Sequence, residues 1–252
     1  MGELTPLAGI MLALLGLAGG IGITAIGPGG VLPTVGLVAF TTLAPAHVAG
    51  TAIVTHVATG VVGTAAYVRS GELRVPAIRK TAWLLAATAL IGTLIGIRIN
   101  SVLSPRWFSM LLGVLLAVVA ALVLLRNRTP DRAPKQPPRS VVLLIGIVVA
   151  VTAGIVGIGG PMLTVPLLVA AGCGVLEALA AAQAQSVVIA AVGTIGYLSQ
   201  DSIDWPLAVL IGVPELAGVL IGWRIARALP TQILRNAMVV ALFTLAPYLA
   251  LR

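Results

Sequence analysis

The stretch AIGPGGVLPTVG, Ala25 to Gly36, interrupts an apolar region near the start of the chain with four glycines and two prolines. Proline inside a helix costs about 3 kcal/mol, because it removes a backbone N–H and its ring collides with the preceding turn. Glycine in a helix interior costs about 1 kcal/mol relative to alanine. A similar stretch, GIVGIGGPMLTVPLL, runs from Gly154 to Leu168. We predict that an apolar helix is broken at both places.

The composition indicates an integral membrane protein. Of the 252 residues, 59% are hydrophobic and only 9% are charged, and the mean hydropathy is +1.13. A soluble core could not hide this much apolar surface. The apolar runs last about 20 residues, the length that an α-helix needs to cross a bilayer, and they lack the alternation of a transmembrane barrel. We therefore expect an all-α polytopic membrane protein whose N-terminal run is retained as a span.

The net charge of +8 comes from basic residues in short connections beside the apolar runs. This placement favours a role in membrane orientation over nucleic-acid binding. Cys173 is the only cysteine, so the sequence offers no disulfide pair and no thiolate cage for a metal. We expect neither a metal nor an organic cofactor.

The apolar segments fall into two halves. We predict a first transmembrane repeat at 1–126, a basic cytoplasmic linker at 127–139 and a second transmembrane repeat at 140–252. The predicted segments are 7–26, 31–44, 47–68, 77–98 and 107–125, then 140–158, 161–171, 176–198, 206–224 and 232–250.

The two halves are related in sequence. An offset of 130 residues places Gly27 on Gly157, Gly30 on Gly160 and Thr34 on Thr164, and the same register continues without a gap to Pro76 and Pro206. After a contraction of four residues, the later glycines and one arginine align as well. An ungapped register over some 50 residues is hard to obtain by chance, so we interpret it as an internal duplication.

Charges predict that the second half is inverted relative to the first. The linker and the connection from Arg69 to Lys80 are basic, whereas the equivalent connection, Ser199 to Asp204, carries two acids. Cytoplasmic connections are enriched in lysine and arginine. Equivalent connections of opposite charge are what inversion predicts, although Arg98 and Arg106 on the outer side count against it.

The second segment of each half is too short to span the bilayer, and we expect each to be a re-entrant half-helix. Unpaired N–H groups at such a break attract anions. We therefore assign substrate binding to the glycine pairs Gly29, Gly30 and Gly159, Gly160. For the GxxxG pairs Gly92, Gly96 and Gly218, Gly222 we prefer tight helix crossing instead.

The third segments supply polar side chains near the middle of the membrane. In the first half Thr51 and Thr55 share a helix face with Thr59, and His56 lies beside it. The second half offers Gln183, Gln185 and Ser186, and Ser186 is equivalent to His56. Each threonine alone is more often structural. A histidine and two glutamines at this depth favour a binding site, because polar groups there need partners.

Two residues are candidates for proton coupling. His56 carries an imidazole, which ordinarily titrates near neutral pH. Glu215 lies about ten residues into its apolar segment, where a carboxylate must be protonated, paired or hydrated. A plain hydrogen bond to a neighbouring helix explains Glu215 equally well, so its role stays open.

The paired blocks GPGGVLPTVGL and GIGGPMLTVPLL, together with GYLSQDSIDWPLAVL and GVLIGWRIARALP, resemble the TauE/SafE sulfite exporter family, also called TSUP-type permeases. The resemblance covers nearly the whole chain. It implies an anion permease in a bacterial inner membrane, for sulfite, thiosulfate or a small organosulfonate such as sulfoacetate.

We therefore predict a secondary transporter of a small anion that works by alternating access. An anion channel and a permease for a small carboxylate are the alternatives. The two histidines, with no HExxH and no GxSxG motif, make an intramembrane enzyme a poor fit, so we predict no enzymatic activity. The expected partners are the small anion and the lipid bilayer, without nucleic acid, and a homodimer is left open.

Overall fold

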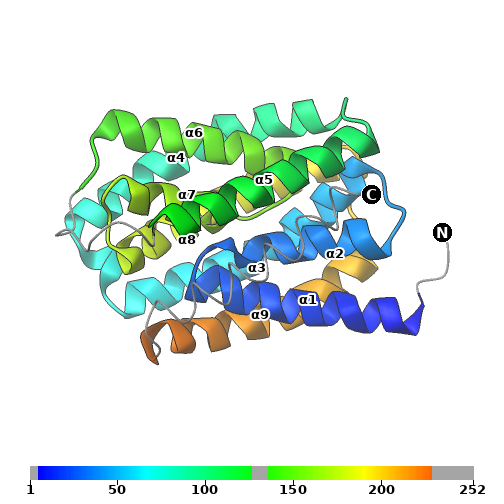
Figure 1. Cartoon of the computed structure of the whole chain (residues 1–252), viewed down its shortest axis with the longest axis horizontal. Helices are drawn as coiled ribbons and strands as arrows, with labels where there is room; N and C mark the ends of the chain where they lie inside the picture. The colour runs from blue at the N-terminus through cyan, green and yellow to red at the C-terminus, as the bar shows by residue number, and fades with distance from the viewer. Residues whose placement is uncertain (1–4, 127–135, 229–252) are drawn as a thin grey trace.

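The computed structural model describes residues 5–126 and 136–228, and in these ranges it contains α-helices, two short 3-10 helices and no strand (Figure 1). The predicted last segment, 232–250, and most of the predicted linker, 127–139, lie outside the described residues. The helices are α1 (Pro6–Ala25), η1 (Pro28–Val31), α2 (Leu32–Phe40), α3 (Pro45–Arg69), η2 (Glu72–Arg74), α4 (Pro76–Asn100), α5 (Pro105–Arg126), α6 (Arg139–Val156), α7 (Pro161–Ala170), α8 (Val175–Leu198) and α9 (Trp205–Ala228).

Six of the described helices are long and apolar enough to cross a membrane, namely α1, α3, α4, α6, α8 and α9. The expected all-α polytopic membrane protein is confirmed. Several of these helices begin at a proline, where the missing N–H would have had no intrahelical acceptor. At the start of α1, the Thr5 hydroxyl also accepts a hydrogen bond from the Ala8 N–H at 3.3 Å.

The two predicted breaks are present. Gly27 has φ 109° and Gly157 has φ 74°, backbone conformations that residues with a side chain rarely adopt. Gly157 directly follows the end of α6, and Gly27 lies two residues after the end of α1. The helices after the breaks, α2 and α7, have 9 and 10 residues. At 1.5 Å per residue each is about 15 Å long, half the thickness of a hydrocarbon core. The short second segments are confirmed, and their re-entrant course stays a prediction.

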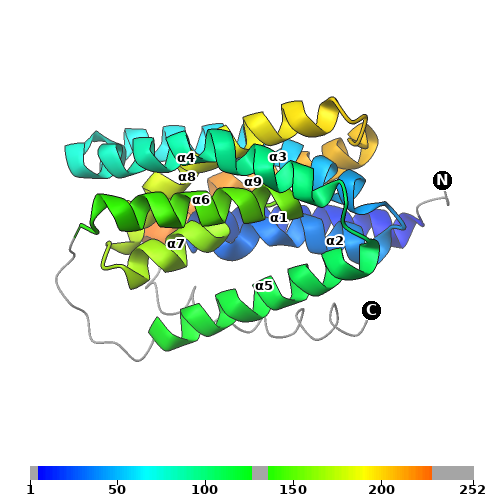
Figure 2. The ribbon, with the colours of Figure 1, turned by 90° about the horizontal axis from the view of Figure 1, so that it is seen from above.

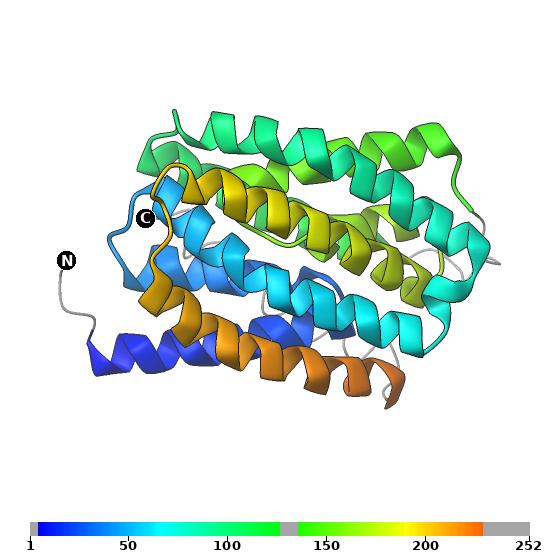
Figure 3. The same cartoon turned by 180° about the vertical axis from the view of Figure 1, so that it is seen from behind.

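The long helices pair across the two halves. Helix α1 packs along α9, α6 packs along α4, and α3 packs along α8. Figure 3 shows α3 and α8 between the α1–α9 pair and the α4–α6 pair. Figure 2 shows α5 along one side of the bundle, where it contacts α7. The middle of α3 and α8 is therefore the part of the described chain enclosed on most sides.

Close glycine contacts allow these pairings. An added Cβ at Gly96 would overlap the Val151 carbonyl oxygen of α6, and one at Gly222 would overlap the Ile21 carbonyl oxygen of α1. Gly92 and Gly218 lie against the same two helices. The prediction that the GxxxG glycines permit tight helix crossing is confirmed.

Equivalent hydrogen bonds occur in the two halves. The Tyr67 hydroxyl donates to the Thr24 carbonyl at 2.9 Å, and the Tyr197 hydroxyl donates to the Gly154 carbonyl at 2.6 Å, each across 43 residues. In Figure 1, α1 and α6, the first helices of the two halves, run in opposite directions. These are features that an inverted duplication would produce, and the duplication itself stays a prediction.

Candidate functional site

The centre of the bundle holds a pair of ionisable side chains. The Nδ1 atom of His56, on α3, lies 3.0 Å from the Oε1 atom of Glu215, on α9, and neither side chain is exposed. The Nε2 atom of His56 lies 3.1 Å from the Gly30 carbonyl oxygen of η1. The pair therefore joins α3, α9 and the first helix break.

The partners of His56 fix how protons are distributed. A carbonyl oxygen only accepts hydrogen bonds, so Nε2 must carry a proton. An unprotonated Nδ1 at 3.0 Å from an ionised carboxylate would set two acceptors against each other, so a favourable contact requires one further proton, on the imidazole or on the carboxyl. With that proton on either group, the pair has no net charge.

Ser186, on α8, lies at the position that the predicted duplication pairs with His56. The Gly160 N–H donates to the Ser186 Oγ atom at 3.3 Å, across the same 26-residue separation that joins His56 to Gly30. The direction of the hydrogen bond is reversed, since the first break presents a carbonyl oxygen and the second presents an N–H. The first break thus contacts α3 through a backbone acceptor, and the second break contacts α8 through a backbone donor, at the same separation along the chain.

Gly159, in the second break, lies close to both Ser186 and His56. An added Cβ at Gly159 would lie 2.9 Å from the Ser186 Oγ atom and 3.6 Å from the His56 Cγ atom, and one at Gly30 would lie 3.4 Å from the His56 Cε1 atom. We call the residues Gly30, His56, Gly159, Gly160, Ser186 and Glu215 the central cluster. Within the described part of the chain, neither the Gly159 N–H nor the Ser186 O–H donates a hydrogen bond.

Ile23, near the end of α1, fills the space between the two breaks. Its Cδ1 atom lies 2.9 Å from the position of an added Cβ at Gly30 and 3.1 Å from that at Gly159. The side chain is fully buried. Sequence reasoning missed Ile23, because an isoleucine in an apolar helix gives no signal of a functional position.

The predicted glutamines lie on other sides of α8. Gln185 accepts a hydrogen bond from the Thr164 hydroxyl at 2.6 Å and donates to the Gly146 carbonyl at 3.2 Å, so it connects α8 to α7 and α6. Gln183 donates to the Ile23 carbonyl at 3.2 Å. Gln183 therefore holds the backbone of Ile23 in place. Gln185 instead binds Thr164 of α7, the helix that follows the second break.

Of the predicted threonines, Thr55 makes a local hydrogen bond and Thr51 a long-range one. The Thr55 hydroxyl donates to the Ala52 carbonyl at 2.9 Å, within α3. The Thr51 hydroxyl accepts from the Asp204 N–H at 2.9 Å, just before α9 begins. Gly29 packs closely against the backbone of α1 at Gly19 and Gly22. Of the predicted binding residues, the structure joins Gly30, His56, Gly159, Gly160 and Ser186 in one place and sets the others around them.

One protein-family model matches nearly the whole chain. The family model described as "Sulfite exporter TauE/SafE" matches residues 12–249, a range that includes every residue of the central cluster. The chain belongs to the TauE/SafE family. The "Probable membrane transporter protein YdhB" of Bacillus subtilis (strain 168) is 22% identical over 236 residues, covering 91% of this chain and 93% of that protein. No solved structure matches.

This TauE/SafE protein is thus a multi-pass membrane protein of a transporter family, as its spans and the matches indicate together. Among its described residues, no group of three or more His, Cys, Asp or Glu side chains could hold a metal ion. Among the described residues, the buried side chains of His56 and Glu215 form the ionisable pair at the centre of the bundle.

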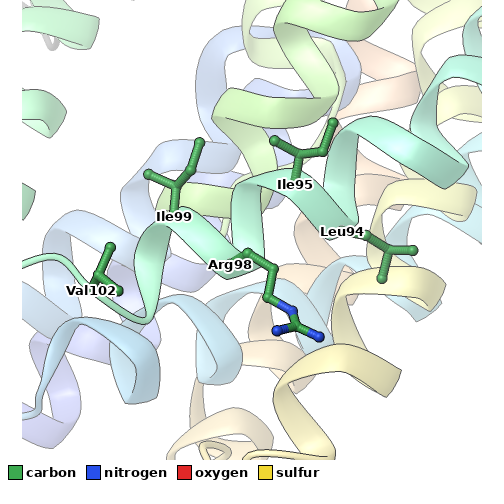
Figure 4. A pocket seen from close by; sticks show the side chains of 5 residues that line it. All are labelled: Leu94, Ile95, Arg98, Ile99 and Val102. Carbon is green, nitrogen blue, oxygen red and sulfur yellow. The ribbon is translucent and has the colours of Figure 1, made fainter.

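A separate apolar groove lies on the surface of the TauE/SafE protein, near the end of α4. It is lined by Leu94, Ile95, Arg98, Ile99 and Val102 (Figure 4). Four of these residues follow one side of α4, Val102 lies just after its end, and Arg98 is the charged one. The groove shares no residue with the central cluster.

Proposed function

We propose that this TauE/SafE protein is a secondary transporter of a small anion in a bacterial inner membrane. The proposed substrates are sulfite, thiosulfate or an organosulfonate such as sulfoacetate, carried by alternating access. The observation that supports the proposal best is the meeting of both helix breaks with His56 and Ser186 at the centre of the bundle. Family membership supports the broader class of membrane permease.

The second break offers the donors that an oxyanion needs. The Gly159 N–H and the Ser186 O–H are buried and donate to no other described group. Helix α7 begins at Pro161, so its N-terminal end, with a partial positive charge, lies beside these donors. We propose that the anion binds to Gly159 and Ser186, close to His56, with Gly30 and Gly160 forming the walls.

The same geometry suggests how transport proceeds. Ile23 fills the space between Gly30 and Gly159, so the anion can bind only after α1 moves relative to the two breaks. Because α1 packs along α9, which carries Glu215, this movement would also affect the His56–Glu215 pair. We propose that the α1–α9 pair moves against α3 and α8 during alternating access, with proton coupling through His56 and Glu215.

Flux measurements test the proposal. Purified protein in proteoliposomes is supplied with ³⁵S-labelled sulfite, thiosulfate or sulfoacetate, and uptake is compared with protein-free liposomes. We expect saturable uptake of at least one anion and acceleration by the same anion on the opposite side. Absence of uptake for all three anions would refute this substrate class, and uptake without counter-exchange would favour a channel. A small carboxylate such as acetate tests the remaining alternative.

Two serine variants locate the site. Ser186→Ala removes a proposed anion donor, and we expect a reduction of uptake by at least tenfold. Ser199→Ala is the matched control, since its hydroxyl is exposed and donates to the Gly196 carbonyl at the end of the same helix. Equal uptake by Ser186→Ala and Ser199→Ala would contradict the assigned site.

A further inference from the structure

The His56–Glu215 pair limits how much positive charge the centre of the protein can offer to a bound anion. As described above, Nε2 donates to the Gly30 carbonyl, and one proton lies between Nδ1 and Glu215, so the pair is neutral. Both carboxylate oxygens of Glu215 and the Nδ1 atom of His56 are buried, and none of the three has a hydrogen-bond partner beyond the 3.0 Å contact between Nδ1 and Oε1. The pair therefore has a place for one more proton, which would leave an imidazolium beside a neutral carboxyl group and a net charge of +1.

The described surroundings of the pair supply no other charge. From α9 the facing group is Glu215, from α8 it is the uncharged Ser186, and from η1 it is the backbone of Gly30. The buried hydroxyls of Tyr67 and Tyr197 donate to carbonyls elsewhere. The other charged side chains on the described helices packed against α3 are on the short helix η2 or near the ends of longer helices: Glu72, Arg74, Arg79, Lys80, Arg98, Arg139, Glu177 and Arg224.

An anion at Gly159 and Ser186 would meet neutral donors and the partial positive charge at the start of α7, but no full positive charge. Burying an anion without a compensating charge is strongly unfavourable, even with hydrogen bonds. The nearby group that can become positive is the His56–Glu215 pair, and it can gain a single proton. A monovalent anion and this proton together would keep the centre neutral, whereas a divalent anion would leave one negative charge uncompensated.

We infer that the transporter carries a monovalent anion together with one proton, so that the transport cycle moves no net charge. This inference rests on the proposed function and refines it. The proton is taken from water on the side where the anion binds, and it is released on the other side when the anion leaves. Among the proposed substrates, hydrogen sulfite fits this rule, whereas thiosulfate and sulfoacetate are divalent at neutral pH.

Membrane potential provides the test. Uptake of ³⁵S-labelled sulfite into proteoliposomes is measured with a potassium gradient and valinomycin at equal pH on both sides, and then with a pH gradient at zero potential. Protein-free liposomes give the leak of uncharged sulfur dioxide, which is subtracted. We expect the initial rate to stay constant over a potential of either sign and to rise several-fold when the side of uptake is acidic. A rate that changes several-fold with the potential would overturn the inference.

A histidine variant adds a second test. His56→Gln leaves Glu215 as the titratable member of the pair, which then cannot reach a net charge of +1, so we expect the response to the pH gradient to disappear. His47→Gln, near the start of α3, is the matched control and should behave like wild type. A folded His56→Gln protein that keeps the wild-type response would also overturn the inference. Absence of any sulfite flux in wild type would count against the proposed function instead, and the wild-type potential test needs no variant.

Discussion

The Nδ1 atom of His56 lies 3.0 Å from the Oε1 atom of Glu215, although 159 residues separate the two along the chain, and both side chains are fully buried. Helices α3 and α9 bring them together, and the first helix break supplies the carbonyl that orients the imidazole. Through this contact, the packing of α9 against α3 places a carboxylate beside the imidazole that contacts the first helix break.

Truncation of Glu215 should destabilise the protein. Glu215→Ala leaves the His56 Nδ1 atom buried without its partner, and we expect the free energy of unfolding to fall by about 3 kcal/mol. Glu215→Gln retains an amide that can donate to Nδ1, so its loss should be about 1 kcal/mol. Unfolding in mixed micelles with a denaturing detergent measures both. Equal stability of Glu215→Ala and wild type would show that the contact contributes nothing.

The two buried tyrosines should contribute similarly to stability. Tyr67→Phe leaves the Thr24 carbonyl without its hydroxyl donor, and Tyr197→Phe does the same for the Gly154 carbonyl. We expect each substitution to lower the free energy of unfolding by about 1 to 2 kcal/mol. The same micelle unfolding assay is suitable. A large effect at one tyrosine and none at the other would argue that the two positions are not equivalent.

Alanine at a helix-crossing glycine should be poorly tolerated. In Gly96→Ala and Gly222→Ala the new methyl group overlaps a backbone carbonyl of the neighbouring helix, so the α4–α6 or α1–α9 pair must separate. We expect a loss of about 2 to 3 kcal/mol, within the range for overpacked sites. Gly174→Ala is the control, since its nearest contact would be an ordinary 3.4 Å to Glu177. A thermal midpoint of Gly96→Ala equal to that of the control would contradict the close crossing.

Shortening Ile23 should change which anions the protein accepts. Ile23→Val removes the δ-methyl group between Gly30 and Gly159, at a stability cost of about 1 kcal/mol. We expect a lower KM for a bulkier anion relative to sulfite, measured as the ratio of the two uptake KM values in proteoliposomes. Ile195→Val, at an exposed isoleucine of α8, serves as the control. An unchanged ratio would mean that Ile23 does not limit the size of the site.

The single cysteine should react slowly. Burial, together with the neighbouring carboxylate of Glu177, raises the pKa of the Cys173 thiol in the α7–α8 connection to about 11. The thiolate is the reactive form, and at pH 8 it should be about a hundredfold scarcer than for a thiol of pKa near 9. Maleimide labelling followed by mass spectrometry should accelerate as the pH rises from 9 towards 11. Labelling at pH 8 at the rate of the unfolded protein would contradict the burial of Cys173.

Much of the fold could be predicted because its causes are local. Hydropathy identified the long spans, and the glycines and prolines at Gly27 to Gly30 and Gly157 to Gly160 located the breaks, since these residues disfavour a helix whatever surrounds them. The GxxxG spacing likewise identified the crossing glycines. Repeated residues at a fixed offset indicated which positions would be equivalent, and the hydrogen bonds of His56 and Ser186 to the two breaks follow that register.

The sequence by itself determined where helices form and break, because hydropathy and backbone sterics act within a few residues. Only the tertiary structure decided which polar groups meet. It paired His56 with Glu215, turned Gln185 towards α6 and α7, engaged Thr51 with the start of α9, and placed the δ-methyl group of Ile23 in the centre. These outcomes depend on how the small residues of α1, α4, α6 and α9 let the helices approach, and that packing joins residues as far apart along the chain as Gly96 and Val151 or Gly222 and Ile21.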